Sequence, residues 1–186
     1  MTPNLRLIRS RIVLHSTTVL LSLAGIVVAQ APPSISTTRP LAVRPGQAVD
    51  VAIQGANLVG VSDIWTSFPS TTALVGDTKN KAKCVYKLTV PADAAVGIHA
   101  LRIAGPGGLS PLKLILVDDI PTTAQAADNF SLDKAQALTL PAAVDGNIDA
   151  LKVRTYKFTA EAGQTVSAEV VAKRIGSALD PLLRLL

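Results

Sequence analysis

The sequence predicts an all-β protein preceded by a signal-peptide helix. Three observations carry this prediction: a basic and then apolar leader, alternation of apolar and polar residues in most later segments, and turn residues between those segments. Apolar side chains at every second position suit a strand with one buried face, and no helical periodicity persists over a long window. The chain has 186 residues, which is enough for one or two small domains.

Residues 1–29 are interpreted as a secretory signal peptide. The positive n-region comprises Arg6, Arg9 and Arg11. The apolar stretch 17–29 that follows is shorter than the ~20 residues that a membrane-spanning helix needs. Small residues at Val27 and Ala29 predict cleavage before Gln30. We therefore expect export, with membrane contact only through the signal peptide; an uncleaved N-terminal anchor is the alternative.

The positive charge of the chain is concentrated in the leader. The whole sequence has a net charge of +5, but without the three leader arginines 15 basic residues face 13 acidic ones, a net charge of +2. A nucleic-acid-binding surface needs clustered basic residues. The nearest candidate is Lys79, Lys81, Lys83 and Lys87, whose alternate spacing suits the solvent side of a strand. We expect no nucleic-acid partner.

Residues 30–118 are predicted to form an immunoglobulin-like β-sandwich. The apolar positions of four alternating runs are Val49, Val51 and Ile53; Cys84, Tyr86, Leu88 and Val90; Leu101 and Ile103; and Leu112, Leu114 and Leu116. The last run is apolar on both faces, which predicts a central strand. The glycines of 105–108 predict a hairpin turn, because glycine reaches positive φ without a Cβ clash. Several short strands at this spacing indicate a sandwich.

Ordered short motifs accompany these strands. The first pieces are Pro33-x-Ile35, Pro45-Gly46 and Val49-x-Val51-x-Ile53-x-Gly55-x-Asn57-Leu58, and the later ones are Val90-Pro91-Ala92-Asp93 and Gly97-Ile98-His99-Ala100-Leu101. The first pieces resemble the opening of the IPT/TIG immunoglobulin-like fold, and the later ones resemble the closing hairpin of similar modules in bacterial surface proteins. The resemblance implies a spacer or an adhesion unit.

Trp65 and Phe68 are the candidate ligand-binding residues of this module. They stand close together in the segment 64–69. One interpretation is an exposed aromatic patch that binds carbohydrate. The interpretation that we favour is a core tryptophan packed between the two sheets.

Residues 119–135 are predicted to form a linker, and residues 136–186 an incomplete β-domain. Alternation resumes at Tyr156 and Phe158, then over 166–172, and a further strand is expected at 182–186.

Four ordered pieces span this last region: Val144-Asp145-Gly146-x-Ile148, Tyr156-x-Phe158-x-Ala160, Ala162-Gly163-Gln164-x-Val166 and Gly176-Ser177-x-Leu179-Asp180-Pro181-x-Leu183-x-Leu185. They resemble the first part of the bacterial pre-peptidase C-terminal domain, a jelly-roll-type β-sandwich appended to many secreted proteins. The resemblance implies a partial jelly roll. We expect it to be poorly stable alone or to borrow strands from another chain.

Residue types able to support catalysis are few. The histidines are His15, in the leader, and His99, in a predicted strand. The single cysteine, Cys84, is expected to be a small buried thiol. Nucleophilic catalysis needs a nucleophile, a base and an orienting group, and no such motif surrounds these residues. We therefore expect no enzyme activity and no disulfide.

No cofactor is expected. Calcium is kept as a weaker alternative, because carboxylates at Asp118, Asp119, Asp145 and Asp149 offer oxygen ligands. Turn-forming aspartates explain these residues equally well.

The leading functional hypothesis is a non-catalytic, exported module of the cell envelope or extracellular space with a structural, adhesive or spacer role. It is expected to be a fragment of a larger multidomain protein. Its partners would be other domains or strands of that protein, another protein, or a polysaccharide. The alternatives are the accessory N-terminal region of a secreted peptidase and a carbohydrate-binding β-sandwich that uses Trp65 and Phe68.

Overall fold

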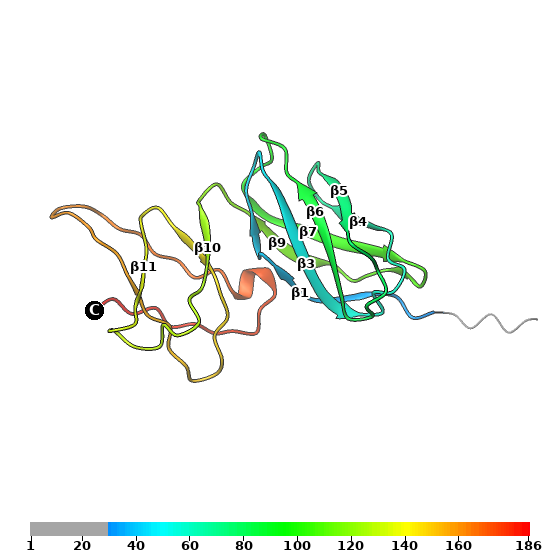
Figure 1. Cartoon of the computed structure of the whole chain (residues 1–186). Coiled ribbons are helices and arrows are strands. Elements are labelled where there is room, and N and C mark those ends of the chain that lie inside the picture. The colour runs from blue at the N-terminus through cyan, green and yellow to red at the C-terminus, as the bar shows by residue number, and fades with distance from the viewer. Residues whose placement is uncertain (1–29) are drawn as a thin grey trace, which may run out of the picture.

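The computed structural model describes residues 30–186, and this part of the chain is all-β (Figure 1). The prediction of an all-β fold is confirmed, whereas the predicted signal peptide at 1–29 lies outside the described residues. The helical element within 30–186 is a single 3₁₀ turn, η1 (Lys173–Ile175). None of the described segments forms a helix with the length and apolar character required to cross a bilayer.

The first half of the structure is a sandwich of two sheets (Figure 1). One sheet has the order β1 (Ser34–Arg39), β3 (Ala48–Ala56), β6 (Lys83–Thr89) and β5 (Thr71–Val75). The other has the order β2 (Ala42–Val43), β9 (Lys113–Val117), β7 (Gly97–Gly105) and β4 (Asp63–Thr66), with β8 (Gly108–Leu109) paired to β7. This order matches the ABED and GFC sheets of an immunoglobulin constant-type domain. The predicted immunoglobulin-like sandwich is therefore confirmed.

Paired strands in the sandwich run antiparallel, with one exception. Strand β2 runs parallel to β9, with Ala42 beside Leu116 and Val43 beside Val117. The first strand segment is thus divided: β1 pairs with β3 in one sheet, and β2 then crosses to the other sheet. This division ties the two sheets together at one edge.

The core lies between the two sheets and is built by the predicted alternation. Its fully buried side chains include Ile53 on β3, Tyr86 on β6 and Leu101 on β7, each at most 1% exposed. The alternate positions of these strands face solvent or are half-buried, as expected for one buried face per strand. Cys84 is buried at 3% exposure, as predicted.

Strand β9 is central, as predicted, because it lies between β2 and β7. Its core-facing residues are Ile115 and Val117, whereas Leu114 is half-buried and Leu112 is 55% exposed. The turn η1 lies against β9. The side of β9 that carries Leu114 therefore lies on the outer face of its sheet, away from the core.

Two glycines fit the close geometry of the sandwich. Gly108 closes the predicted hairpin between β7 and β8 with φ of +109°, a value that L side chains rarely adopt. Gly55 lies where β3 passes β1: a Cβ there would lie 1.8 Å from the backbone oxygen of Ser34. A residue with a side chain would force the two strands apart.

Residues 119–186, called here the second β-region, contain short strands only. These are β10 (Thr122–Ala124), β11 (Gln136–Ala137), β12 (Ala143–Asp145) and β13 (Tyr156–Lys157). They form two parallel pairs, β10 with β12 and β11 with β13. The predicted linker at 119–135 thus contributes β10 to one of these pairs.

The strands predicted over 166–172 and 182–186 are not formed, which corrects the sequence-based expectation. Ala172 is buried, but the large apolar side chains that point out of these segments are exposed, from 37% at Val166 to 93% at Leu182. An alternating segment becomes a strand only when a neighbouring strand accepts its backbone hydrogen bonds. Within residues 30–186 no strand occupies that position for either segment.

Polar contacts, more than an apolar core, hold the second β-region together. The buried apolar residues of the described chain beyond Val117 are Ala172 and Ile175. By contrast, Asn129 is fully buried, and its side-chain oxygen accepts a 3.0 Å hydrogen bond from Arg154 Nη1. The guanidinium of Arg154 also lies 4.1 Å from the centre of the Phe130 ring, a cation–π contact.

Candidate functional site: the junction of the sandwich and the second β-region

The two predicted ligand-binding aromatics lie in different environments. Trp65 on β4 is 53% exposed, so the favoured interpretation of a core tryptophan is wrong. Phe68 is buried, and its ring meets that of His99 edge to face, with centroids 5.0 Å apart. Ile64 takes the core position of β4, and the next side chain along a strand must face outward. The structure therefore does not bring Trp65 and Phe68 into one exposed patch.

Two of the four aspartates considered as calcium ligands make other contacts in the structure. Asp118 Oδ1 accepts a 3.1 Å hydrogen bond from the backbone N–H of Ile120, a local turn contact. Asp145 on β12 contacts Arg39. Over residues 30–186, three or more His, Cys, Asp or Glu side chains do not gather in a geometry that would hold a metal ion.

Cys84 and His99 both lie on strands of the sandwich. Burial raises the pKa of Cys84 to about 11, so this side chain is a neutral thiol near pH 7. Burial also raises the pKa of the neighbouring Tyr86 to about 12, with smaller contributions from Cys84 and Asp63. His99 Nε2 donates a 2.8 Å hydrogen bond to the backbone oxygen of Ala95. His99 thus lies half-buried in β7.

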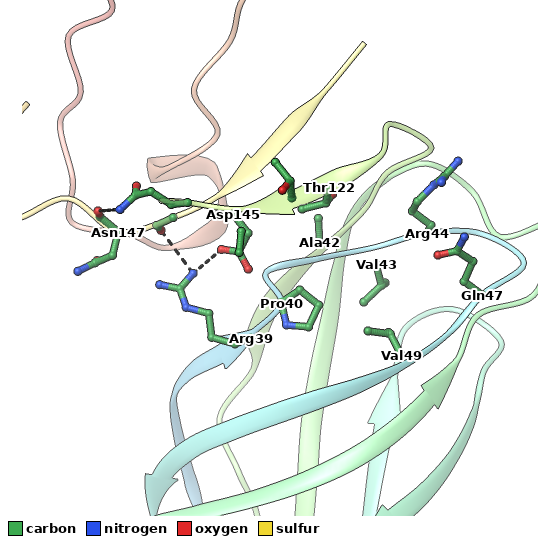
Figure 2. Close-up of a pocket in the computed structure, with 14 residues that line it drawn as sticks. Arg39, Pro40, Ala42, Val43, Arg44, Gln47, Val49, Thr122, Asp145 and Asn147 are labelled. Atoms are coloured by element: carbon green, nitrogen blue, oxygen red, sulfur yellow. Dashed lines mark hydrogen bonds and ion pairs between the residues drawn. The ribbon is translucent and has the colours of Figure 1, made fainter. Parts of the chain in front are cut away.

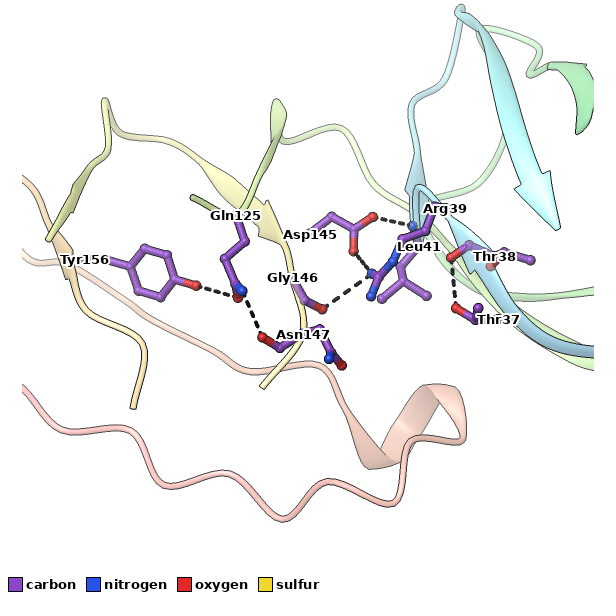
Figure 3. A network of polar contacts seen from close by, with 9 residues as sticks. All are labelled: Thr37, Thr38, Arg39, Leu41, Gln125, Asp145, Gly146, Asn147 and Tyr156. Atoms are coloured by element: carbon purple, nitrogen blue, oxygen red, sulfur yellow. Dashed lines mark hydrogen bonds and ion pairs between the residues drawn. The ribbon is translucent and has the colours of Figure 1, made fainter. Parts of the chain in front are cut away.

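A group of long-range polar contacts joins the sandwich to the second β-region (Figure 3). Asp145 Oδ1 forms an ion pair with Nη1 of Arg39, the last residue of β1. Asp145 Oδ2 accepts a 2.8 Å hydrogen bond from the backbone N–H of Leu41. The Asp145 side chain is 9% exposed, whereas that of Arg39 is 41% exposed. One nearly buried carboxylate thus binds two groups of the sandwich.

The contacts continue from Asp145 into the second β-region. The backbone N–H of Gln125 donates a 3.0 Å hydrogen bond to the backbone oxygen of Asp145. Gln125 Nε2 donates to the backbone oxygen of Asn147 at 2.8 Å, and Gln125 Oε1 accepts a 3.3 Å hydrogen bond from the Tyr156 hydroxyl (Figure 3). A Cβ on Gly146 would lie 2.2 Å from that same oxygen. The junction is therefore closely packed around Gln125.

An open groove of about 620 Å³ runs along this junction (Figure 2). Arg44 and Gln47 contribute to its wall from the sandwich, and Thr122 and Asn147 contribute from the second β-region. The buried hydroxyl oxygen of Thr122 has no hydrogen-bond partner. Because both regions form the walls, the shape of the groove depends on the junction being closed.

From the sequence, Asp145 is a potential calcium ligand and part of the motif Val144-Asp145-Gly146-x-Ile148, and nothing there indicates a role for Arg39. The two residues are separated by 106 positions. In a single sequence, nothing indicates that two opposite charges so far apart in the chain form an ion pair. The Asp145-Gly146 step did give a partial signal, because a glycine there accommodates the close approach of Gln125.

Comparison of the chain with protein-family models and with curated proteins finds no match. The resemblances to the IPT/TIG fold and to the pre-peptidase C-terminal domain therefore stay predictions.

Proposed function

We propose that this chain is a non-catalytic structural module that acts as a spacer or adhesion unit in a larger, exported envelope or extracellular protein. The observation that carries the proposal is the junction made by Asp145. A spacer must keep the parts that it connects at a fixed distance and angle. The Asp145 carboxylate, bound to Arg39 and to the Leu41 N–H, is a contact suited to that task.

The junction holds the two regions at several separate places. The chain itself connects β9 to β10 through residues 118–121. Asp145 binds the end of β1, and η1 lies against β9. One flexible connection would leave the two regions free to rotate, whereas additional contacts away from it oppose that rotation. The arrangement supports the proposal of a spacer with a fixed internal angle.

Support for export comes from the leader sequence. Its basic start and short apolar stretch are the pattern of a secretory signal peptide. The IPT/TIG-like motifs of the sandwich support an adhesive or spacer role in the same compartment. The pre-peptidase-like motifs support placement in a secreted multidomain protein.

The spacer proposal predicts a specific result for Asp145→Ala. We expect the variant to lose on the order of 1–2 kcal/mol of junction stability, a modest value because Arg39 is partly exposed and its charge is screened. Spin labels at Lys81→Cys and Asp133→Cys, one in each region, report the distance by pulsed electron paramagnetic resonance. Buried Cys84 is expected to stay unlabelled. The variant should broaden the distance distribution that the unsubstituted junction keeps narrow.

Asp50→Ala is the matched control, because Asp50 also pairs with a cation, Lys87, at 3.8 Å, but on the exposed surface of the sandwich. It should leave the distribution narrow. A distribution already broad with Asp145 in place would contradict the proposed spacer role. So would equal, narrow distributions in both variants, since Asp145 would then not fix the angle.

The second part of the proposal concerns partners: strands from another segment or chain complete the second β-region. Two-stranded sheets are marginally stable in water, and each small sheet here leaves its outer edges unpaired within residues 30–186. The same region has exposed apolar side chains close together in the sequence, including Leu182, Leu183, Leu185 and Leu186. A strand added beside them would remove apolar surface from water.

Hydrogen exchange of the chain on its own tests this part. Backbone amides of 158–186 should exchange almost as fast as in an unfolded peptide, because few of them have partners. Amides in the centre of β3, β6 and β7 provide the internal reference and should exchange far more slowly. Protection of 158–186 equal to that of β6 would mean that the region is already complete, and the proposal would be withdrawn.

A further inference from the structure

Strand β5 is an open edge of the first sheet. It ends the order β1-β3-β6-β5, so one side of its backbone pairs with β6 and the other side has no strand within residues 30–186. Its sequence, Thr-Thr-Ala-Leu-Val, carries no charge, no proline and no glycine. The free N–H and C=O groups of such an edge are a template for another strand.

The other edges of the sandwich have features that discourage pairing. Strand β1 has an irregular register between Ile35 and Thr37. Strand β2 contains only two residues, and β4 contains four and begins with the charged Asp63. Bulges, short length and charges are the usual protections of an edge strand. Strand β5 combines five uncharged residues with a regular register to β6.

The side chain of Leu74 gives a second reason to expect a strand beside β5. Leu74 is the register partner of Tyr86, whose side chain faces the core and is 1% exposed. Leu74 therefore lies on the core side of its sheet, yet it is 40% exposed. Its outer flank is uncovered because the sheet ends at β5. A strand added at this edge would bury apolar surface as well as pair the backbone.

We propose that a second copy of this chain supplies that strand, so that two sandwiches join through antiparallel β5 strands about a twofold axis at Ala73. In this register Thr71 lies opposite Val75 of the partner subunit, and Thr72 lies opposite Leu74 of the partner subunit. A twofold interface requires a self-complementary surface.

The pairing is self-complementary, which favours a second copy as the occupant. None of the five paired positions is charged, so like charges do not meet within the strand pair. The Asp63 carboxylate, which accepts a 2.9 Å hydrogen bond from the Thr72 hydroxyl, lies beside this edge and not in the pairing. If the pairing extends, Asp77 meets Pro69 and Lys79 meets Ser67, again without repulsion. The inference goes beyond the spacer role, because it gives the module a way to associate with itself through a face remote from the Asp145 junction.

Disulfide trapping tests the register directly. Directly opposite residues of an antiparallel pair have Cα atoms about 4.5–5.5 Å apart, within the range that a disulfide spans. Ala73→Cys should therefore give covalent dimers under mild oxidation. Val96→Cys is the control, because Val96 is 57% exposed and lies outside the strands. Equal dimer yields for the two variants, or none for Ala73→Cys, would overturn the proposal.

Sedimentation equilibrium provides an independent measurement. The unsubstituted chain should show a monomer–dimer equilibrium over about two decades of concentration. Val75→Lys should weaken the dimer at least about tenfold, because it places a charge on the pairing edge, whereas Val96→Lys should not change it. Val75 is 38% exposed, so unchanged far-ultraviolet circular dichroism will verify the fold. A chain that stays monomeric, or a Val75→Lys variant that dimerises equally well, would refute pairing through β5.

Discussion

Replacing Gly55 with alanine is expected to lower the free energy of unfolding of the sandwich by about 3 kcal/mol, at the upper end of the cost of overpacking. The added Cβ would lie 1.8 Å from the backbone oxygen of Ser34. A backbone atom cannot rotate away as a side chain does, so β1 must move from β3. Because β1 carries Arg39 at its end, the same movement should also loosen the contact with Asp145.

Gly76→Ala is the comparison for this prediction. Gly76 has φ of +83° and open space around it, so alanine there carries only the conformational cost of a left-handed backbone, about 1–2 kcal/mol. Urea unfolding followed by far-ultraviolet circular dichroism measures both variants. The prediction fails if Gly55→Ala lowers the free energy of unfolding no more than Gly76→Ala does. In that case β1 would not lie as close to β3 at Gly55 as it does in the structure.

Leu101→Ala should cost about 2–5 kcal/mol, the range for removing a large side chain from a close-packed core. Leu101 is fully buried on β7, between Thr66 of β4 and Lys113 of β9 in the strand register. The two sheets meet at this position, so little rearrangement is available to fill the cavity. A single domain has only about 5–15 kcal/mol of stability, so the midpoint of urea unfolding should fall markedly.

Leu182→Ala removes the same atoms from a side chain that is 93% exposed. Surface substitutions of this kind usually change stability by less than about 0.5 kcal/mol. Because both variants shorten the same type of side chain, the difference between their free energies of unfolding reports how tightly each leucine is packed. A large loss for Leu182→Ala would mean that residues 182–186 are packed, contrary to their exposure in the structure.

The sandwich was the most predictable part of the chain, because alternation reports burial directly. Each of the runs around Ile53, Tyr86 and Leu101 became a strand whose apolar side faces the core. Trp65 was mispredicted because β4 has only four residues, too few to establish which side faces inward. Its hydrophobicity suggested burial, but the neighbouring Ile64 already occupied the core position.

The second β-region was less predictable for a different reason. Alternation over 166–172 shows that a strand would have one apolar face, but it does not say whether a neighbouring strand exists. The pairing of β10 with β12 and the ion pair of Arg39 with Asp145 depend on how distant segments meet. Single polar residues far apart in the chain provide no periodic pattern from which to predict that meeting.

The parallel pairing of β2 with β9 has a mechanical consequence. The chain enters the sandwich at β1, continues into β2 and leaves after β9, so tension that passes through β1 pulls β2 and β9 in opposite directions along their length. The connecting hydrogen bonds include Leu116 N–H to the oxygen of Leu41 at 3.0 Å and Asp118 N–H to that of Val43 at 2.9 Å. Such bonds bear the load together, in shear, instead of opening one after another. The β2–β9 pair thereby resists stretching once the tension has passed through β1.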